Sequence, residues 1–511
     1  MSDWTSGYVA DIGYTYGYYT ELNPLKAILP LLNAGIALPT VGAACELGFG
    51  QGLSINMHAA ASNTQWAGTD FNPSQAGFAQ ELGTVTGAGA RMFDEAFAEF
   101  AARTDLPDFD YIGLHGIWSW ISDDNRAVIV DFVRRKLKVG GLLYISYNTL
   151  PGWATFAPMR HLLTQHAQTL AAPGAGVVNR IDQALAFTDK LLASNPAYTR
   201  VNTHVAERLG KVKEQNRHYL AHEYFNKDWH PMYFSTMADW LGPAKLGFAC
   251  SASYVDHIDA LNLSDEQQAL LKEIPDAVFR ESVRDFMVNQ QFRKDYWIKG
   301  ARKLTPLEQA EAQRQVRVLL VSPRADVSLK VNGVQGEANM SEAIYGPILD
   351  LLADHKPRSL GQIEQGIKDK GVSFPQLFQS VMVLAATGHL VPVQDEALAN
   401  KLRKQTDRLN GHLAHKARSS NEIAYAASPV AGGGHMITRF GLLFVQALAL
   451  GKKAPADLAA HVWVYMQAQG QKIVKDGKAL EAEADNLAEI TVQATAFLDK
   501  QLPILKALQI V

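Results

Sequence analysis

The sequence has few cysteines, few leader-like features and few long apolar runs, and each shortage excludes a class of protein. Only Cys45 and Cys250 occur among 511 residues, too few for a disulfide scaffold or a cysteine-based zinc site. The N-terminus has no basic start followed by an apolar core. The apolar run at 440–450 is interrupted and too short to cross a bilayer. We therefore expect a cytoplasmic protein with no membrane span.

Excess charge of one sign is also missing. The 48 Lys and Arg residues nearly balance the 51 Asp and Glu residues, which leaves a net charge of −3. Phosphate contacts need concentrated positive charge, so nucleic acid is not expected as a partner. With 47% hydrophobic and 19% charged residues, the composition is that of an ordinary globular protein, and the length predicts several domains.

The first third of the chain has the pattern of a parallel α/β sheet. Short β-rich runs alternate with helix-like segments, which is typical of a doubly wound architecture. Ser122 can cap one of these helices, and Gly140-Gly141 are expected to end it. The expected strands are 41–47, 65–70, 90–93, 109–115 and 142–147, with 244–254 and 292–299 finishing the sheet later in the chain.

The remaining sequence divides at changes in pattern. After Pro151-Gly152 it becomes helical before the two late strands, which indicates an insertion into the sheet domain. A long apolar helix followed by Gly388 and a short strand resembles the end of a winged helix. The predicted units are a core at 1–154, an inserted helical dimerisation or regulatory module at 155–242, completion of the sheet and a middle region at 243–304, and a mainly helical, winged-helix-like domain at 305–511.

A glycine-rich loop, Glu46-Leu-Gly-Phe-Gly-Gln-Gly52, lies between the first expected strand and a helix. Glycines at this point allow a tight turn and let a ligand approach the backbone at a helix N-terminus. Asp70 ends the second strand, where a carboxylate can accept hydrogen bonds from both hydroxyls of a ribose. Asp94 ends the third strand, where it could meet an adenine amino group. These acidic strand ends predict a nucleoside site.

The spacing and charge of the loop narrow the ligand. Gly50 and Gly52 are separated by one residue, whereas dinucleotide loops place two residues there. Glu46 would repel a diphosphate but attract the ammonium of an amino-acid-bearing ligand such as S-adenosylmethionine (SAM). A dinucleotide and a structural turn without a ligand are the alternatives, and no GxxxxGK[ST] motif supports a nucleoside triphosphate.

The glycine loop, Asp70 and the FDEAF segment resemble the class I SAM-dependent methyltransferases. The strings YGYYTELNP, HGIWSWIS, YNTLPGW and EYFNKDWHPMYF resemble a narrower bacterial group with a methyltransferase regulatory domain, which includes the rickettsial protein lysine methyltransferases. The resemblance implies a seven-stranded Rossmann-like methyltransferase sheet, SAM as cofactor with S-adenosylhomocysteine as product, and a homodimer. The predicted cofactor-binding residues are Tyr16, Glu46, Gly48, Gly50, Gly52, Asp70, Phe71, Asp94, Glu95 and His115.

Aromatic side chains follow the fourth and fifth strands, where ligands bind in such sheets. Aromatic walls suit a methylated cation, although core packing is the alternative for each of them. His115 could contact the cofactor, act as a base or be structural, and an arm with Tyr14, Tyr16, Tyr18 and Tyr19 could fold over the cofactor. The catalytic candidates are His115, Trp118 and Tyr147, and the predicted substrate channel comprises Trp118, Tyr147, Asn148, Trp153 and Glu223.

His218 and His222 could share a helix face, but they lack the HExxH order and an obvious third ligand, so no metal is expected. The main hypothesis is a methyltransferase that acts by in-line displacement on lysine side chains of a protein, such as a surface or outer-membrane protein precursor. The alternatives are methylation of a small molecule, glycan or lipopolysaccharide precursor, and a SAM-binding regulatory protein.

Overall fold

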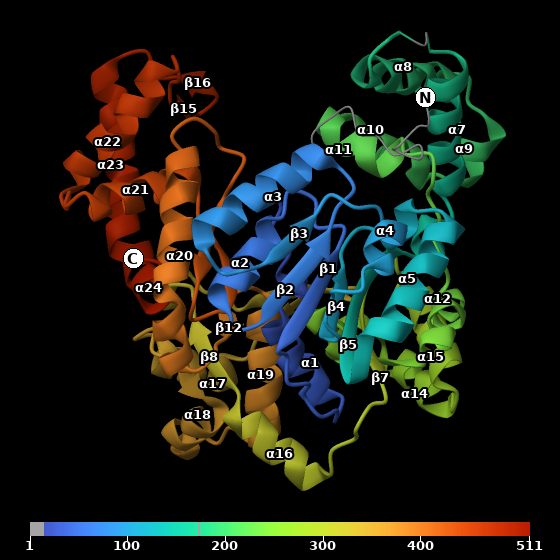
Figure 1. Ribbon diagram of the computed structural model, residues 1–511, viewed down its shortest axis with the longest axis horizontal. Helices are drawn as coiled ribbons and strands as arrows, with labels where there is room; N and C mark the ends of the chain where they lie inside the picture. The colour runs from blue at the N-terminus through green and yellow to red at the C-terminus, as the bar shows by residue number, and fades with distance from the viewer. Residues whose placement is uncertain (1–14, 172–173) are drawn as a thin grey trace.

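A seven-stranded sheet forms the centre of the molecule in the computed structural model, which describes residues 15–171 and 174–511 (Figure 1). The strand order is β3-β2-β1-β4-β5-β7-β6, in which β1 to β5 are parallel and β7 is antiparallel to both of its neighbours. This confirms the predicted doubly wound sheet and its late completion. The strands are β1 Ala43–Leu47, β2 Gln65–Thr69, β3 Arg91–Phe93, β4 Phe109–Leu114, β5 Leu137–Asn148, β6 Leu246–Ser251 and β7 Phe292–Lys299.

Helices cover both faces of the sheet, because successive strand residues point to opposite sides. In β1, Ala44 packs in the cluster with α2 and α3, whereas Cys45 packs in the cluster with α4 and α5. Both cysteines are buried and free. The helices around the core are α1 Ile28–Asn33, α2 Leu53–Ala61, α3 Pro73–Thr86, α4 Phe97–Ala102 and α5 Asp123–Lys136.

The junction of α5 with β5 differs from the prediction. The Ser122 hydroxyl caps α5 by accepting a hydrogen bond from the Asn125 amide, as expected. The helix ends at Lys136, however, and β5 begins at once and runs through Gly140-Gly141. The register with β4 shifts there and Gly140 has a φ of 80°, so these glycines form an irregularity at the start of the strand. The predicted helix end was therefore wrong.

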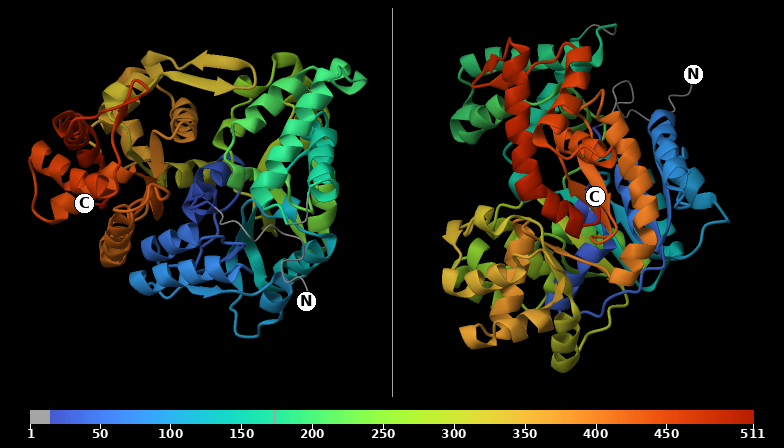
Figure 2. Two further views of the ribbon diagram at one scale, coloured as in Figure 1. Left: turned by 90° about the horizontal axis from the view of Figure 1, so that it is seen from above. Right: turned by 90° about the vertical axis from the view of Figure 1, so that its left-hand side faces the viewer.

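A helical segment separates β5 from β6. Helices α7 to α11 surround a hydrophobic cluster of their own, whereas Phe234, Met237 and Leu241 of α12 pack into the core of the sheet domain. Figures 1 and 2 show α7 to α11 on the side of the core opposite the C-terminal helices. The helices are α6 Leu150–Trp153, α7 Ala157–Thr169, α8 Val177–Ala193, α9 Ala197–Val201, α10 His204–Lys213, α11 Arg217–Tyr224 and α12 Phe234–Leu241.

The last part of the chain returns to the core. Helix α19 is followed by Gly388 and the short strand β12, as the sequence indicated, and β12 pairs with β8 in a three-stranded sheet. Helix α20 packs against α2 and α3, and the β13–β14 hairpin packs against α2. Across the described residues, no helix has both the length and the apolar character that crossing a membrane requires. The main elements here are β8 Arg317–Leu320, α17 Glu342–Leu352, β11 Arg358–Ser359, α18 Leu360–Gly366, α19 Phe374–Ala386, β12 Leu390–Pro392, α20 Glu396–Lys416, β13 Tyr425–Ser428, β14 Gly433–Met436, α21 Arg439–Ala449, α22 Pro455–Ala468, α23 Glu483–Ala496 and α24 Leu502–Ala507.

The other elements connect these units. Helices α13 Asp259–Asn262, α14 Asp265–Glu273 and α15 Ala277–Met287 lie between β6 and β7, and α16 Pro306–Gln315 precedes β8. Two small hairpins complete the chain, β9 Lys330–Gly333 with β10 Gly336–Asn339 and β15 Val474–Lys475 with β16 Lys478–Ala479. Short 3-10 or π turns are at Thr20–Leu22, Pro24–Ala27, Trp118–Trp120, Gly242–Ala244, Tyr254–His257, Arg324–Asp326, Lys368–Lys370 and Phe497–Gln501.

Candidate active site

The glycine loop connects β1 with α2 and bends over the carboxyl end of the sheet. Gly48, Gly50 and Gly52 have φ values of 74°, 56° and 68°, a region that favours glycine. A Cβ at Gly48 would overlap Ile117, and one at Gly52 would overlap Ala79 of α3. Gly48 therefore keeps the loop close to the β4 end, whereas Gly52 permits packing of the two helices.

Two buried carboxyl groups border this loop. Asp70 accepts hydrogen bonds from the amides of Gly50 and Asn72, at 2.9 and 3.0 Å, and burial raises its pKa to about 6. Glu46 is 2% exposed, and its Oε2 has no hydrogen-bond partner among the described residues. Burial, and after it the nearby Asp70, raises the pKa of Glu46 well above its usual range. A ligand with an ammonium group would supply the missing partner and lower this cost.

The loop and the acidic groups line two adjoining pockets. They share Gly48, Asp70 and Ile117, and the larger pocket has a volume of about 460 Å³. Glycines, carboxylates and an aromatic ring together suit a ligand with ribose, adenine and amino-acid parts. Seven of the predicted cofactor residues line one or both pockets: Glu46, Gly48, Gly50, Asp70, Phe71, Glu95 and His115.

Three predicted cofactor residues lie elsewhere. Tyr16 packs edge-on against Phe78, with ring centroids 5.1 Å apart, and Gly52 is a packing position. Asp94 is exposed and outside both pockets, whereas its neighbour Glu95 lines the larger one. Of these two predicted residues, the structure therefore places Glu95 at the larger pocket, and the adenine contact of Asp94 stays a prediction. One more residue of the predicted arm, Tyr14, lies outside the described residues.

The segment at 15–23, here called the N-terminal strap, borders the smaller pocket. Thr15, Gly17 and Tyr19 line it, and the Tyr19 amide donates a hydrogen bond to Ser54 Oγ at 2.9 Å. The Tyr18 side chain instead contacts His58, with its hydroxyl 3.1 Å from Nε2. The sequence predicted an arm over the cofactor with Tyr14, Tyr16, Tyr18 and Tyr19, and Tyr16 was the one predicted to bind the cofactor. In the structure Tyr19 lines the pocket instead.

His115 lies at the end of β4 among aromatic rings. Its ring stacks on Tyr19 with centroids 4.1 Å apart, and its Nδ1 is 2.7 Å from the Tyr144 hydroxyl. Burial is the main cause that lowers the pKa of His115 to about 4, so the imidazole is neutral at pH 7. Tyr144 was not singled out in the sequence. Residues of β5 alternate between the two faces of the sheet, and Tyr144 lies on the same face as Ala44.

Two catalytic candidates prove to be core residues. Trp118 is fully buried, and its carbonyl accepts hydrogen bonds from the Arg126 guanidinium. Tyr147 is also fully buried, and its hydroxyl donates to Asp295 Oδ2 at 2.7 Å. Both belong to the hydrophobic cluster on the α5 side of the sheet. The structure places neither of them at the two pockets: alternation in β5 turns Tyr147 into the core, whereas Trp118 is buried in the turn Trp118–Trp120 that follows β4. Trp120 instead lines the larger pocket.

The other predicted channel residues lie at the end of β5, just after it, or in the insertion. Asn148 ends β5, its carbonyl accepts the Met232 amide at 2.9 Å, and its Nδ2 has no hydrogen-bond partner among the described residues. Trp153 packs on the Trp229 ring with centroids 4.9 Å apart. Glu223 lies on α11. Residues 226–228 also line the larger pocket. In the sequence they were noted only as part of EYFNKDWHPMYF, one of the strings that carry the family resemblance.

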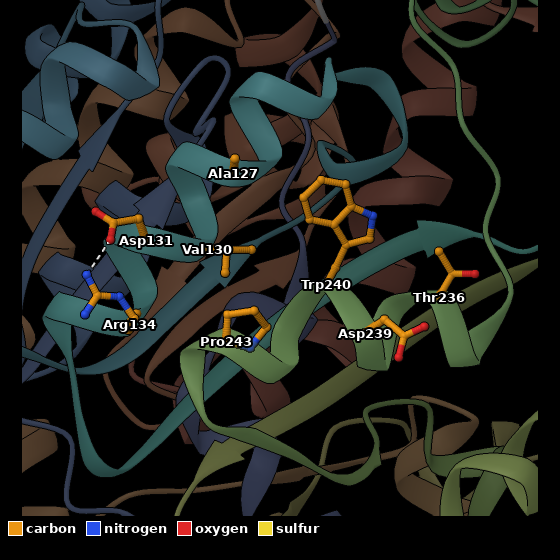
Figure 3. Close-up of a pocket in the computed structure, with 8 residues that line it drawn as sticks. All are labelled: Ala127, Val130, Asp131, Arg134, Thr236, Asp239, Trp240 and Pro243. Carbon is orange, nitrogen blue, oxygen red and sulfur yellow. Dashed lines mark hydrogen bonds and ion pairs between the residues drawn. The ribbon is translucent and has the colours of Figure 1, made fainter.

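A separate surface pocket of about 460 Å³ lies between α5 and α12 (Figure 3). It is lined by residues such as Val130 and Trp240, and its polar groups include Asp131, which forms an ion pair with Arg134 at 2.6 Å. None of the glycine-loop or acidic strand-end residues borders it. The pocket is therefore separate from the candidate active site.

The strand order, the glycine loop and the acidic strand ends define the fold of the class I SAM-dependent methyltransferases. The structure superposes on PKMT2 from Rickettsia typhi in complex with AdoHcy with a TM-score of 0.68, at 17% identity, over 96% of this chain and 100% of that one. The model of the predicted methyltransferase regulatory domain matches residues 216–299.

The uncharacterized protein sll1526 of Synechocystis is 40% identical over 512 residues, which cover 99% of each chain. The chain therefore belongs to the family of this Synechocystis protein. It has the fold of the class I methyltransferases and a match to the methyltransferase regulatory domain. The uncharacterized protein RP789 of Rickettsia prowazekii is 27% identical over 55% of this chain and 51% of its own length.

Proposed function

We propose that the protein is a SAM-dependent methyltransferase that methylates lysine side chains of a protein substrate. The observation that carries the cofactor assignment is the pair of buried carboxyl groups, Glu46 and Asp70, around a loop of glycines. This arrangement repels a diphosphate but attracts a ligand with an ammonium group and a ribose. PKMT2, which shares the fold, was crystallised with AdoHcy, and this supports the same choice.

The residues have separate roles in this proposal. Glu46 would bind the ammonium of SAM, Asp70 the ribose hydroxyls, and Glu95 with Phe71 the adenine side of the larger pocket. When bound, SAM supplies an activated methyl group. Tyr19 and His115 border the end of the pocket where the acceptor would enter, and they would align it and exclude water.

The wider organisation is part of the same proposal. The units are the core at 1–154, the inserted dimerisation or regulatory module at 155–242, the middle region at 243–304 and the C-terminal domain at 305–511. A cytoplasmic location and a homodimer complete it. The resemblance to rickettsial protein lysine methyltransferases supports lysine as the acceptor.

Calorimetric titration with SAM tests the cofactor assignment. Asp70→Ala should weaken binding more than about tenfold, because hydrogen bonds to a charged group contribute about 1.5–3 kcal/mol. Asp108→Ala is the matched control, since this carboxylate is exposed and outside both pockets, and the affinity of this variant should equal that of the wild type. Equal affinity in both variants would refute the ribose assignment.

Incubation of a cell lysate with labelled SAM tests the acceptor. Label in protein bands, with intact-mass increments of one methyl group and modified lysines in peptide maps, is the expected result. Label found only in small molecules would overturn the protein acceptor and favour the small-molecule, glycan or lipopolysaccharide alternative. Binding of SAM without any transfer would favour the regulatory alternative.

A further inference from the structure

Helix α20 has a concentration of positive charge that the chain as a whole lacks. It contains five Lys and Arg residues but only two Asp and Glu residues, a net charge of +3 with neutral histidines, against −3 for the whole chain. Most of its cationic side chains follow one another at spacings of three or four residues, so they share one exposed or half-buried helix face. The residues of this face, here called the basic stripe, are Lys401, Lys404, Arg408, His412, His415 and Lys416.

Few carboxylates neutralise the basic stripe. Lys416 Nζ lies 3.0 Å from Glu81 Oε1 of α3. Lys401, Lys404 and Arg408 form no ion pair with a carboxylate of the described residues, and all three are exposed. Like charges one turn apart on a helix repel each other. A partner with negative charge would relieve this repulsion.

The basic stripe begins near the N-terminal strap and runs away from it along α3 (Figure 1). At one end, Lys416 Nζ lies 4.9 Å from the centroid of the Phe78 ring, and Phe78 contacts Tyr16 of the strap. Farther along, the Arg408 guanidinium donates a hydrogen bond to the carbonyl of Thr86, the last residue of α3. Because the strap also borders the smaller pocket, a molecule bound in the candidate active site can extend onto the stripe.

The composition of the stripe favours an acidic protein segment over other anionic partners. A helix that binds a membrane surface buries its apolar face in the lipid, but Leu409 and Leu413 of α20 are already buried against α2 and α3. Single-stranded nucleic acid stacks its bases on aromatic rings, and the stripe has no Phe, Tyr or Trp. Proteins that bind a DNA duplex contact about 6–10 phosphates, whereas the stripe has only four Lys and Arg residues.

We propose that the basic stripe docks an acidic segment of the protein whose lysine is methylated, an inference that rests on the proposed function. The stripe spans residues 401–416 of a continuous helix and is therefore about 22 Å long, which matches about seven extended residues of a partner. Opposite charges on the two surfaces would bring the substrate to the enzyme and fix its orientation. The preferred substrate then has an acidic segment at some distance from its lysine.

Fluorescence anisotropy of a labelled peptide measures docking without turnover. The probe is an acetylated, lysine-free peptide of alternating Glu and Ser, and the comparison peptide has Gln in place of Glu. The full-length wild type should bind the Glu peptide more tightly. The double variant Lys401→Glu/Lys404→Glu should bind it at least about tenfold more weakly, because two attractions become repulsions. Lys368→Glu/Lys370→Glu, the same charge change at exposed lysines outside the stripe, is the matched control and should bind as the wild type does.

Methylation kinetics test whether docking serves the reaction. A lysine peptide is joined through a series of Gly/Ser linkers either to the Glu–Ser segment or to its Gln counterpart. For the wild type, the KM of the acidic peptide should be about tenfold lower at the linker length that spans the two sites, with equal kcat. Lys401→Glu/Lys404→Glu should lose this difference in KM but keep the kcat and the Kd for SAM. About 0.5 M salt should remove the difference in the wild type as well.

The outcomes separate the docking inference from the proposed function. If the wild type methylates lysine but treats the acidic and Gln peptides alike, or if the stripe variant behaves as the wild type does, docking is overturned and the function stands. If no lysine is methylated in the peptides or in lysate proteins, the proposed function is overturned and the inference falls with it. Tighter binding of a DNA duplex or of phosphatidylserine vesicles than of the Glu peptide, lost in the stripe variant, would assign the stripe to another partner and also overturn the inference.

Discussion

A methyl group added at Gly434 should weaken SAM binding, although this residue lies in the C-terminal β13–β14 hairpin and outside the pocket. Its Cβ would lie 2.7 Å from Met57 Sδ and 2.9 Å from two carbons of the Tyr18 ring. Such contacts force the neighbours to move. The Tyr18 ring has little room, because it is 6% exposed and also packs against Tyr425.

The size of the effect follows from what moves. Overpacking of a buried site costs about 1–3 kcal/mol, and displacement of Tyr18 would also stretch its hydrogen bond to His58. The next residue, Tyr19, stacks on His115 and lines the smaller pocket. If about 1.4 kcal/mol of this strain is relieved by movement of the N-terminal strap away from the pocket, the Kd for SAM rises about tenfold.

Calorimetry with SAM and a thermal unfolding scan measure this prediction for Gly434→Ala. The control is Gly411→Ala in α20, where an added Cβ meets no atom within 4 Å. This change should leave the Kd unaltered and raise stability by about 0.5–1 kcal/mol, because glycine is unfavourable inside a helix. A folded Gly434→Ala protein with the Kd of the wild type would show that the hairpin does not position the strap.

Two further predictions concern buried acids and a buried phenol. SAM binding at pH 7 should release a proton from Glu46, because burial keeps the pKa of this group high until the ligand ammonium arrives. The calorimetric binding enthalpy of the wild type should therefore vary with the ionisation enthalpy of the buffer. In Glu46→Gln it should vary much less. Tyr147→Phe should destabilise the fold by about 1–3 kcal/mol in chemical unfolding, because Asp295 loses a buried donor, while the Kd for SAM stays unchanged. Weakened SAM binding in Tyr147→Phe would contradict the placement of Tyr147 outside the pocket.

The sequence predicted the sheet well because periodicity and strand-end chemistry are local properties. The glycine loop, Glu46 and Asp70 were all predicted from spacing and charge, and the pairing of β1 with β2 brings Asp70 beside the loop. The acceptor side was harder, because an aromatic residue near a strand end can point to the core or to the pocket. Trp118 and Tyr147 point to the core. Their contacts with Arg126 and Asp295, respectively, fix this orientation, and such contacts cannot be read from the local sequence.

The N-terminal strap connects the smaller pocket with the C-terminal region. Consecutive side chains of an extended segment point to opposite sides, so Tyr18 contacts the C-terminal hairpin while Tyr19 contacts His115. Tyr18 also shares a hydrophobic cluster with Met57 of α2 and Leu409 of α20. Removal of the C-terminal helices would expose this cluster and leave one side of the strap without support. The C-terminal region therefore supports the strap that borders the smaller pocket, although the described residues that line the two pockets all come from the core and the insertion. Its separation from the core would alter the site.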